Sequence, residues 1–338
     1  MNRHFNLLAL QAACAALLLA GAPHAYAQLR IATWNIAWLA NKPLPDRAAV
    51  ERCEAEKRAH RDSEMRAPEC RGNVFRMAGA YSALAAYART LDADVVALQE
   101  VEGEEALARI FDTGEYEFRV SRSPGRQRTA FAVRRKILAG RPQFRDVAEI
   151  GAPQKERPRH GLEALLPLAG GSSLRLLNVH LKSFCHTVAL TTDTEDCRIL
   201  AAQVPPLEAW IDEAHRRGGP FIVLGDMNRV FDVEGPQARV SGRTANMWPE
   251  IDDNDPGGLR LALLTRGQRH SADCLHRTHN GKSPYFIDHF IAGGEAIERI
   301  AGPVTELPYK VLASDERARH VPRRFLSDHC AIWVHYQP

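Results

Sequence analysis

The stretch that decides the fold is FIVLGDMNRVF, which runs from Phe221 to Phe231. Its first four residues are apolar, and such a run indicates a buried strand. The run stops at Gly225, and a carboxylate and an amide follow at alternate positions, Asp226 and Asn228. Because side chains two residues apart at a strand end point the same way, we expect both to face one ligand.

Other predicted strands also carry polar residues at or near an end. The apolar segments predicted as strands are residues 29–39, 93–101, 128–135, 173–181, 283–294 and 327–336. Their conspicuous polar residues are Asn35, Glu100, His180, Asp288, Asp328 and His329. Asp288 is expected inside an apolar strand, where an unpaired carboxylate is costly to bury. A histidine or a metal ion is therefore its expected partner.

Two segments have the pattern of helices. In residues 73–91, NVFRMAGAYSALAAYARTL, apolar residues recur at helical spacing, which predicts an amphipathic helix. Residues 198–218 look helical at both ends, with an interruption or a fresh helix start expected at Pro205–Pro206. Strands outnumber long helices and both alternate along the chain, which favours a single α/β domain with sheet on each side of a core.

The N-terminus has the pattern of an export signal. Residues 1–27 contain Arg3, an apolar centre from Leu7 to Ala20 and the small-x-small sequence Ala25-Tyr26-Ala27. A buried N-terminal helix is the alternative interpretation. Cys14 lacks the preceding sequence of a lipoprotein site, so we expect export to the periplasm or medium without a membrane anchor.

The remaining residues, 28–338, are expected to form one domain with a charged insertion at about 41–72. The whole chain of 338 residues has a formal charge of +3, which is too small to argue for nucleic acid by itself. Its apolar and charged fractions are ordinary for a globular protein and argue against disorder and membrane residence.

Without Cys14, six cysteines remain, an even number for an oxidising compartment. Two pairs bracket short loops, and the last two would close a longer one. The predicted pairs are Cys53–Cys70, Cys185–Cys197 and Cys274–Cys330. Zinc binding is the rival interpretation, but no C-x-x-C motif or histidine cluster supports it.

The polar set combines amide and carboxylate oxygens without thiolates. Such hard oxygen ligands suit Mg²⁺ or Mn²⁺ better than zinc. Histidine and arginine beside a metal suit a phosphate substrate, because an Asp–His pair can manage protons while the metal neutralises phosphoryl oxygens.

In this order, the motifs TWN, LQE, NVHLKS, LGDMN, FIDHF and SDH resemble the endonuclease/exonuclease/phosphatase superfamily, also called DNase I-like. The resemblance covers Trp34 to His329. It implies a four-layer α/β/β/α sandwich, in which two packed, mostly antiparallel sheets are flanked by helices. The site would lie at one edge, where loops of both sheets converge.

The resemblance also implies roles for residues. Those expected to hold the metal, Mg²⁺ with Mn²⁺ or Ca²⁺ as alternatives, are Asn35, Glu100 and Asp328. Asp226 would position or deprotonate the attacking water, and Asn228 would orient it. His180 and His329 would contact the scissile phosphate, with His329 held by Asp288. Arg128 would bind phosphate, and Gly225 would permit a tight turn beneath it.

Two departures bear on the branch of the superfamily. Tyr116 does not match the catalytic tyrosine expected of an AP endonuclease, and a signal peptide argues against genomic repair. His289 follows Asp288 at a position where several relatives have arginine. The alternatives for it are a supporting role and an exposed position without a role, and we favour the exposed position.

We therefore expect an exported, metal-dependent nuclease acting on DNA or RNA, in which the cationic tract Arg119–Lys136 lines a groove for phosphates. A solvated arginine-rich loop is the alternative for that tract. The alternative function is a phosphodiesterase or phosphatase of small or lipid phosphoesters, such as a sphingomyelinase. A catalytically inactive binding protein would be expected to lack some of these residues, and all are present. A monomer is favoured.

Overall fold

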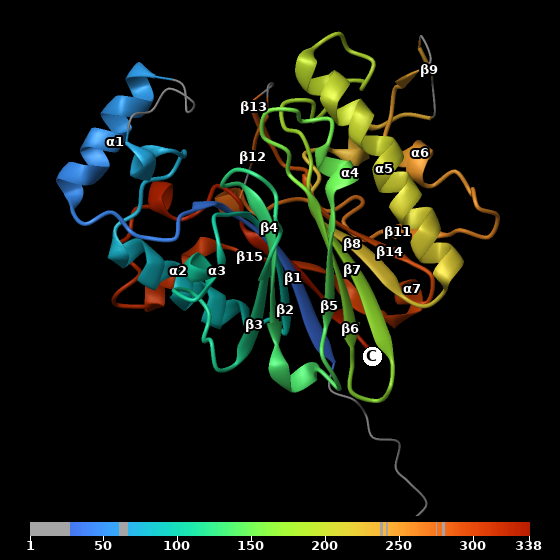
Figure 1. Ribbon diagram of the computed structural model, residues 1–338, viewed down its shortest axis with the longest axis horizontal. Helices are drawn as coiled ribbons and strands as arrows, with labels where there is room; N and C mark the ends of the chain where they lie inside the picture. The colour runs from blue at the N-terminus through green and yellow to red at the C-terminus, as the bar shows by residue number, and fades with distance from the viewer. Residues whose placement is uncertain (1–27, 61–66, 237–238, 241–242, 275, 279–280) are drawn as a thin grey trace, which may run out of the picture.

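The computed structural model describes residues 28–60, 67–236, 239–240, 243–274, 276–278 and 281–338. Two six-stranded sheets pack face to face, and helices cover their outer faces (Figure 1). The predicted signal peptide, residues 1–27, lies outside the described part. Within that part, no helix combines the length and apolar character needed to cross a membrane.

The two sheets have matching topologies. The first contains, in spatial order, β15 (Ile300–Leu307), β16 (Ala331–Tyr336), β1 (Leu29–Leu39), β2 (Val95–Val101), β4 (Arg128–Arg134) and β3 (Tyr116–Val120). The second contains β11 (Leu261–Leu263), β14 (Asp288–Gly293), β8 (Phe221–Asp226), β7 (Ser173–His180), β6 (Gly161–Pro167) and β5 (Gln143–Val147). Each sheet has one parallel pair at its centre, β1 with β2 and β7 with β8, and its other pairs are antiparallel. The prediction of mostly antiparallel sheets is confirmed.

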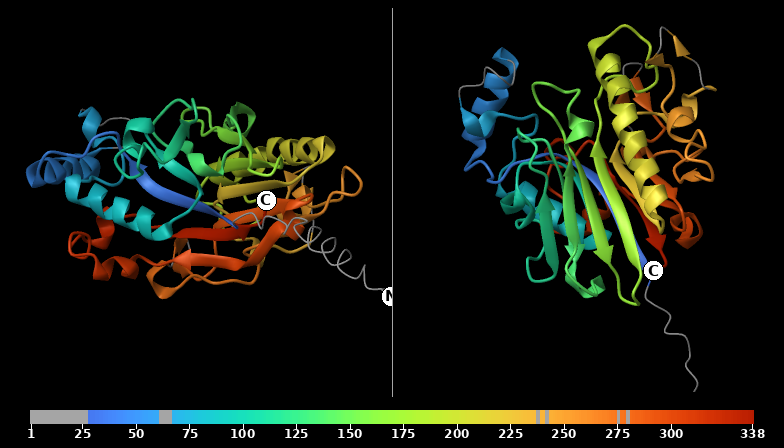
Figure 2. Two further views of the ribbon diagram at one scale, coloured as in Figure 1. Left: turned by 90° about the horizontal axis from the view of Figure 1, so that it is seen from below. Right: turned by 45° about the vertical axis from the view of Figure 1, so that its right-hand side comes forward.

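Two long helices form the outer layers, α2 (Ala78–Leu91) on the first sheet and α5 (Glu195–Arg217) on the second (Figure 2). The shorter helices are α1 (Arg47–Ala59), α3 (Glu104–Leu107), α4 (Ala148–Gly151), α6 (Trp248–Ile251) and α7 (Ala296–Arg299). The short 3-10 segments are Pro68–Cys70, Arg135–Ile137, Phe231–Val233, Ala272–Cys274, Tyr309–Ser314 and Arg323–Phe325. Two small antiparallel ribbons pair β9 (Arg239–Val240) with β10 (Arg243–Thr244) and β12 (His276–Thr278) with β13 (Gly281–Ser283). The four-layer sandwich is therefore confirmed.

Alternating side chains explain the layers. On β1, Ile31 points into the apolar core between the sheets, while Ala32 and Trp34 point into the core beneath α2. On β2, Ala97 lies in the core between the sheets and Leu98 lies in the core beneath α2. Because side chains alternate across a strand, a strand that is apolar at successive positions must be covered on both faces.

The prolines of the second long helix do not interrupt it, contrary to the prediction. Helix α5 is continuous from Glu195 to Arg217 with Pro205 and Pro206 inside. Leu200, Val204 and Leu207, on both sides of the prolines, all pack into the core of the second sheet. This burial of apolar surface offsets the loss of a helical hydrogen bond at each proline.

The charged insertion forms α1 and has a small apolar cluster of its own. Cys53 on α1 is joined to Cys70, and both are buried with Leu44, Val50 and Phe75. In Figure 1, α1 and the N-terminal end of α5 both lie towards the top of the view, with α1 at the left. The other disulfides join Cys185 to Cys197 and Cys274 to Cys330, so all three pairs agree with the sequence prediction.

A hydrogen-bonded amide pair crosses the apolar space between the sheets. Asn178 of β7 donates to the carbonyl oxygens of Leu98 on β2, at 2.9 Å, and of Ala130 on β4, at 2.8 Å. Gln99 of β2 donates to Asn178 Oδ1 at 2.7 Å and to Thr33 Oγ1 at 3.0 Å. Both amide side chains are fully buried. These bonds fix how β7 lies across β2 and β4.

Replacing Asn178 by leucine should lower the free energy of unfolding by about 1–3 kcal/mol, because the amide of Gln99 would lose a buried acceptor. The double variant Asn178→Leu/Gln99→Leu should lose less than the sum of the two single variants, since an apolar pair leaves no polar group unpaired. Urea denaturation of the three variants measures this. Additive losses would show that the two amides do not act as a pair.

Candidate active site

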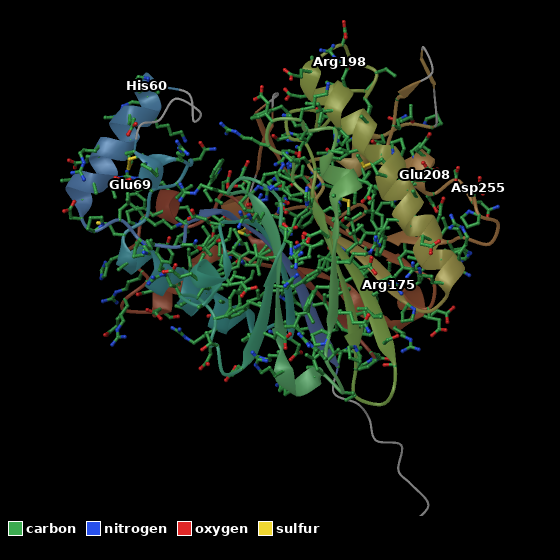
Figure 3. All side chains as sticks on the ribbon, in the orientation of Figure 1. His60, Glu69, Arg175, Arg198, Glu208 and Asp255 are labelled. Carbon is green, nitrogen blue, oxygen red and sulfur yellow. A yellow bond between two sulfur atoms is a disulfide. The ribbon has the colours of Figure 1, made fainter. Side chains whose placement is uncertain are left out.

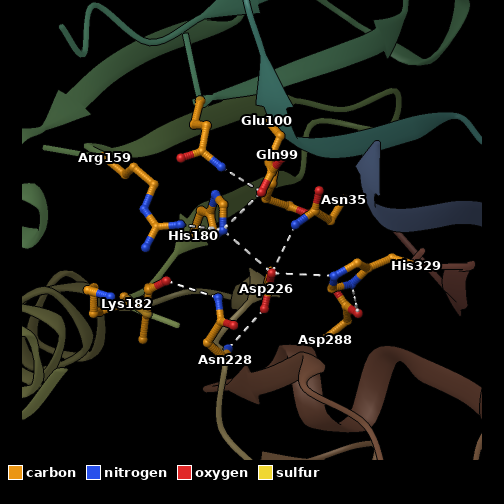
Figure 4. Close-up of polar contacts among 12 residues, drawn as sticks. Asn35, Gln99, Glu100, Arg159, His180, Lys182, Asp226, Asn228, Asp288 and His329 are labelled. Atoms are coloured by element: carbon orange, nitrogen blue, oxygen red, sulfur yellow. Dashed lines mark hydrogen bonds and ion pairs between the residues drawn. The ribbon is translucent and has the colours of Figure 1, made fainter. Parts of the chain in front are cut away.

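Loops and strand ends of both sheets meet at one end of the sandwich, where they bring the predicted polar residues together (Figure 4). They line a cleft of about 1250 Å³ that contains Asn35, Glu100, His180, Asp226, Asn228, Asp328 and His329. Asp288 does not line the cleft itself but contacts His329, which does. Of the residues expected in the site, Asp328 is the exposed one. The structure therefore assembles the expected residues, except Arg128, at a single place.

Asp226 lies at the centre of the cluster and is 2% exposed. Its Oδ2 accepts a hydrogen bond from Asn35 Nδ2 at 2.9 Å, and its Oδ1 accepts one from the Asn228 backbone N–H at 2.9 Å. The Nε2 atoms of His180 and His329 lie 3.5 and 3.8 Å from Asp226 Oδ2. Burial raises the pKa of Asp226 to about 7, so this carboxyl group can exchange a proton near neutral pH.

His329 forms a hydrogen-bonded dyad with Asp288, with Nδ1 2.7 Å from Asp288 Oδ2. Asp288 is the first residue of β14, rather than an interior residue, and stands directly opposite Asp226 in the antiparallel register. Burial alone would lower the pKa of His329, but the carboxylate of Asp288, with those of Asp226 and Asp328, outweighs it and raises that pKa well above 6.5. A protonated His329 between Asp226 and Asp288 separates two carboxylates that would otherwise repel each other.

His180 has the opposite protonation. Its Nε2 lies 2.6 Å from Nη1 of the buried Arg159. A guanidinium group can only donate, so Nε2 is the acceptor and the proton of the neutral ring sits on Nδ1. Burial, followed by the charge of Arg159, lowers the pKa of His180 well below 6.5. The cleft thus holds a neutral histidine on one side of Asp226 and a charged one on the other.

The backbone is left-handed at several of these positions. Glu100 has φ of 63°, Asn228 of 51°, and Ala37 and Trp38 of 53° and 54°. The Trp38 N–H donates to Glu100 Oε2 at 3.0 Å, and Gln127 donates to Glu100 Oε1 at 2.7 Å. Non-glycine residues seldom adopt this conformation, and such strain concentrates at functional sites.

Gly225 lies inside β8 and is required by the neighbouring strand. Its φ is 134°, and a Cβ atom there would stand 2.1 Å from the carbonyl oxygen of Val179 on β7. The close approach of β8 to β7 places Asp226 beside His180, its register partner on β7. The prediction that Gly225 permits a tight turn was therefore wrong: the residue lies within a strand that is paired on both sides, and its lack of a side chain allows a close backbone contact inside the sheet.

Two groups of side chains have the chemistry to hold a cation. Glu100 and Asn35 offer oxygen atoms beside the exposed Asp328. Burial, followed by the nearby charge of Asp328, raises the pKa of Glu100, and a divalent ion would relieve this accumulation of negative charge. The second group is Asp226, Asp288 and His329, whose ligand atoms lie within 4.8 Å of one another. Cys274 and Cys330 also lie beside Glu306, but their disulfide excludes them as ligands.

Arg128 is not brought to the cleft. Its guanidinium donates to the backbone carbonyls of Ser123, at 2.9 Å, and Glu102, at 3.0 Å. The neighbouring Gln127 reaches the site instead.

Sequence reasoning missed several polar residues of the cleft. Two of them contact predicted site residues: Arg159, which contacts His180, and His186, whose Nε2 lies 3.0 Å from Asn228 Oδ1. Arg159 precedes β6 and His186 follows β7, and neither belongs to one of the sequence motifs. Only their positions beside His180 and Asn228 in the structure identify them.

Arg76 was also missed by the sequence analysis, and it holds the backbone segments that carry site residues. It is buried and donates to the carbonyl oxygens of Ile36, Trp38, Phe325 and Leu326. It therefore ties the strained end of β1 to the segment that leads to Asp328 and His329. Burial lowers the pKa of Arg76 to about 10, at which it stays charged at neutral pH.

His289 is not in an exposed position, so that interpretation was wrong. It is fully buried, with Nδ1 2.5 Å from Thr265 Oγ1 and Nε2 2.7 Å from the Arg229 carbonyl oxygen. Since the carbonyl can only accept, Nε2 carries the proton of the neutral ring. Burial lowers the pKa of His289 to about 4.

Two packed sheets with paired histidines and carboxylates at one end define a DNase I-like protein. A model of the endonuclease/exonuclease/phosphatase family matches residues 32–329. The chain belongs to this family, whose members are phosphoesterase hydrolases. A comparison with curated protein sequences found no match.

Solved structures show the same fold at low sequence identity. Truncated Caenorhabditis elegans TDP2 has a TM-score of 0.52 and 16% identity, covering 92% of this chain and 98% of that one. D. rerio TDP2 complexed with a single strand DNA product has a TM-score of 0.51 and 15% identity, covering 92% and 100%. ANGEL2, a 2',3'-cyclic phosphatase, in complex with adenosine-2',3'-vanadate has a TM-score of 0.52 and 14% identity, covering 91% and 95%.

The buried His289 should make the fold sensitive to acid. Its folded-state pKa of about 4 lies below the ordinary 6.5, so the unfolded chain binds more protons between these pH values. The stability that the neutral ring contributes is complete above pH 6.5 and is lost as the pH falls towards 4. Between pH 7.5 and 5, unfolding free energy should fall by about 2 kcal/mol more in the wild type than in His289→Gln.

Urea denaturation at the two pH values measures this difference, with the exposed His320→Gln as the matched control. An equal pH dependence of His289→Gln and the wild type would contradict the assignment of His289 as a neutral core residue.

Proposed function

We propose that the chain is an exported, divalent-metal-dependent phosphodiesterase that cleaves nucleic acid. The observation that carries this proposal is the buried Asp226 between two histidines of opposite protonation. A neutral His180 lies beside Arg159 on one side, and a charged His329 is held by Asp288 on the other. This arrangement supplies a base near neutral pKa and positive charge for a phosphate within one cleft.

In the proposed reaction, Asp226 accepts a proton from the attacking water, which Asn228 orients. A pKa of about 7 suits a general base at neutral pH. The water oxygen forms a bond to phosphorus, the bond from phosphorus to the leaving sugar oxygen breaks, and the leaving oxygen takes up a proton from solvent. The charges of His329 and Arg159 stabilise the phosphoryl oxygens from two sides.

Asn35 and Glu100, with Asp328 beside them, would hold the divalent cation. We propose Mg²⁺, with Mn²⁺ and Ca²⁺ as alternatives, because oxygen ligands predominate in this group. When bound, the cation neutralises phosphoryl oxygens and polarises the phosphorus centre. The Trp38 N–H and Gln127 already orient the Glu100 carboxylate, so its oxygens are held in place before a cation arrives.

The cleft favours a polymeric phosphodiester as substrate. The cationic residues that line it are Lys155, Arg157, Arg159, Lys182, Arg198, Arg323 and Arg324. Arg198, one of these residues, lies near the N-terminal end of α5 (Figure 3). Such a series of charges suits successive backbone phosphates better than one small phosphoester. The TDP2 structure that contains a single strand DNA product has the same fold and supports this choice.

Export is part of the proposal because all six cysteines outside residues 1–27 are paired. Disulfides persist in oxidising compartments such as the periplasm and the medium. The pattern of residues 1–27 supports the same conclusion.

Purified mature protein should degrade plasmid DNA or RNA with Mg²⁺ and not with EDTA. Replacing His329 by alanine should lower kcat by roughly 10²–10⁴-fold, because the charge beside the phosphate is lost. Agarose gels and bis-p-nitrophenyl phosphate turnover measure these effects. The exposed His320→Ala is the matched control, and its activity should equal that of the wild type.

Sphingomyelin vesicles test the lipid alternative under the same conditions. Turnover of vesicles or small diesters with intact plasmid and RNA would contradict the nuclease assignment. Full activity of His329→Ala would contradict the assigned site.

A further inference from the structure

Phe184 presents an aromatic ring to the cleft instead of burying it. It is 54% exposed, the largest exposure among the large hydrophobic side chains of the described residues, and it lines the cleft wall. Its φ is 72°, a conformation that is rare for a bulky side chain. A single exposed apolar residue is ordinary, but this aromatic residue stays more than half exposed although its backbone is strained. This combination points to a ligand.

The loop that carries Phe184 is held rigidly. Cys185 is joined to Cys197 at the start of α5. The buried guanidinium of Arg229 donates to the carbonyl oxygens of Cys185, at 2.8 Å, and Val188, at 2.5 Å. A platform that is fixed before binding loses little conformational entropy when a ligand stacks on it.

Phe184 also lies next to the reacting centre. The ring centroids of Phe184 and His186 are 6.4 Å apart, and His186 Nε2 lies 3.0 Å from Asn228 Oδ1. Phe184 is four residues after His180 in the chain. A group stacked on the Phe184 ring would therefore belong to the part of the substrate adjoining the scissile phosphate.

The charges around the ring select the kind of ligand. Lys182 Nζ, which also pairs with Asp196, lies 5.3 Å from the Phe184 ring centroid. Arg159 and Arg198 line the same cleft. These cations attract a phosphate chain and repel the quaternary ammonium of a choline headgroup. The matching ligand has a flat aromatic face joined to phosphate, as a nucleotide unit has.

We propose that Phe184 is a stacking platform for the nucleobase adjoining the scissile phosphate. The enzyme then prefers single-stranded or unpaired nucleic acid, because the bases of a duplex already stack on one another. This inference rests on the proposed nuclease function and adds to it the class of substrate.

The test compares Phe184→Ala, Phe184→Trp and Val188→Ala. Val188 is exposed on the same loop and is not among the cleft-lining residues. The substrates are a labelled single-stranded oligonucleotide, its duplex and bis-p-nitrophenyl phosphate. Phe184→Ala should lower kcat/KM on the single strand by about 5- to 150-fold, the effect of losing one base–aromatic stack, mainly through KM. The loss on the duplex and on the small diester should be smaller, Phe184→Trp should retain activity, and Val188→Ala should match the wild type.

A spectroscopic measurement separates stacking from a structural effect. A 2-aminopurine oligonucleotide bound to the His329→Ala protein should lose fluorescence, and adding Phe184→Ala should restore it. Equal activity of Phe184→Ala and the wild type on the single strand would overturn the stacking proposal while leaving the nuclease function intact. A uniform loss on all three substrates would also overturn it. Wild-type turnover of the small diester without any cleavage of nucleic acid would overturn both proposals.

Discussion

The site depends on the amide pair that joins the two sheets, Asn178 and Gln99. An apolar interface between sheets allows many relative positions, because hydrophobic contact has little directionality. Hydrogen bonds from Asn178 to Leu98 O and Ala130 O select one of them. Gln99 precedes Glu100, and Asn178 lies two residues before His180, so the bond that aligns the sheets also brings these two functional side chains together. His180 Nε2 and Glu100 Oε1 are 3.8 Å apart as a result.

A second constraint acts at the irregular ends of the strands. The register of β1 with β2 shifts between Asn35 and Leu39, and left-handed residues follow Asn35 and occur at Glu100. Arg76 satisfies the backbone carbonyls that this irregular segment leaves without ladder partners. Its charge remains buried because four carbonyl oxygens surround it. Arg76 thus helps to maintain the strained backbone although it does not line the cleft.

Much of this arrangement follows from the sequence because it is carried by local patterns. Apolar runs such as Phe221–Leu224 predict buried strands, and the polar residues after them predict which ends meet. The disulfide pairs also follow, since two of them close short loops. The continuity of α5 through Pro205 does not follow, because packing against the second sheet overrides a local preference there. The roles of Arg159 and Arg76 do not follow either, since each depends on atoms from segments distant in the chain.

Asp226 and Asp288 show how the fold distinguishes two identical side chains. They stand opposite each other on β8 and β14, where two like charges would destabilise the pair. His329 joins them, with Nδ1 on Asp288 and Nε2 towards Asp226. Asp288 thereby keeps a close charged partner, whereas Asp226 has mainly amide donors and a buried environment that raises its pKa to about 7. Our proposal of Asp226 as base and of Asp288 as the residue that holds His329 therefore rests on which carboxylate lies closer to the imidazole.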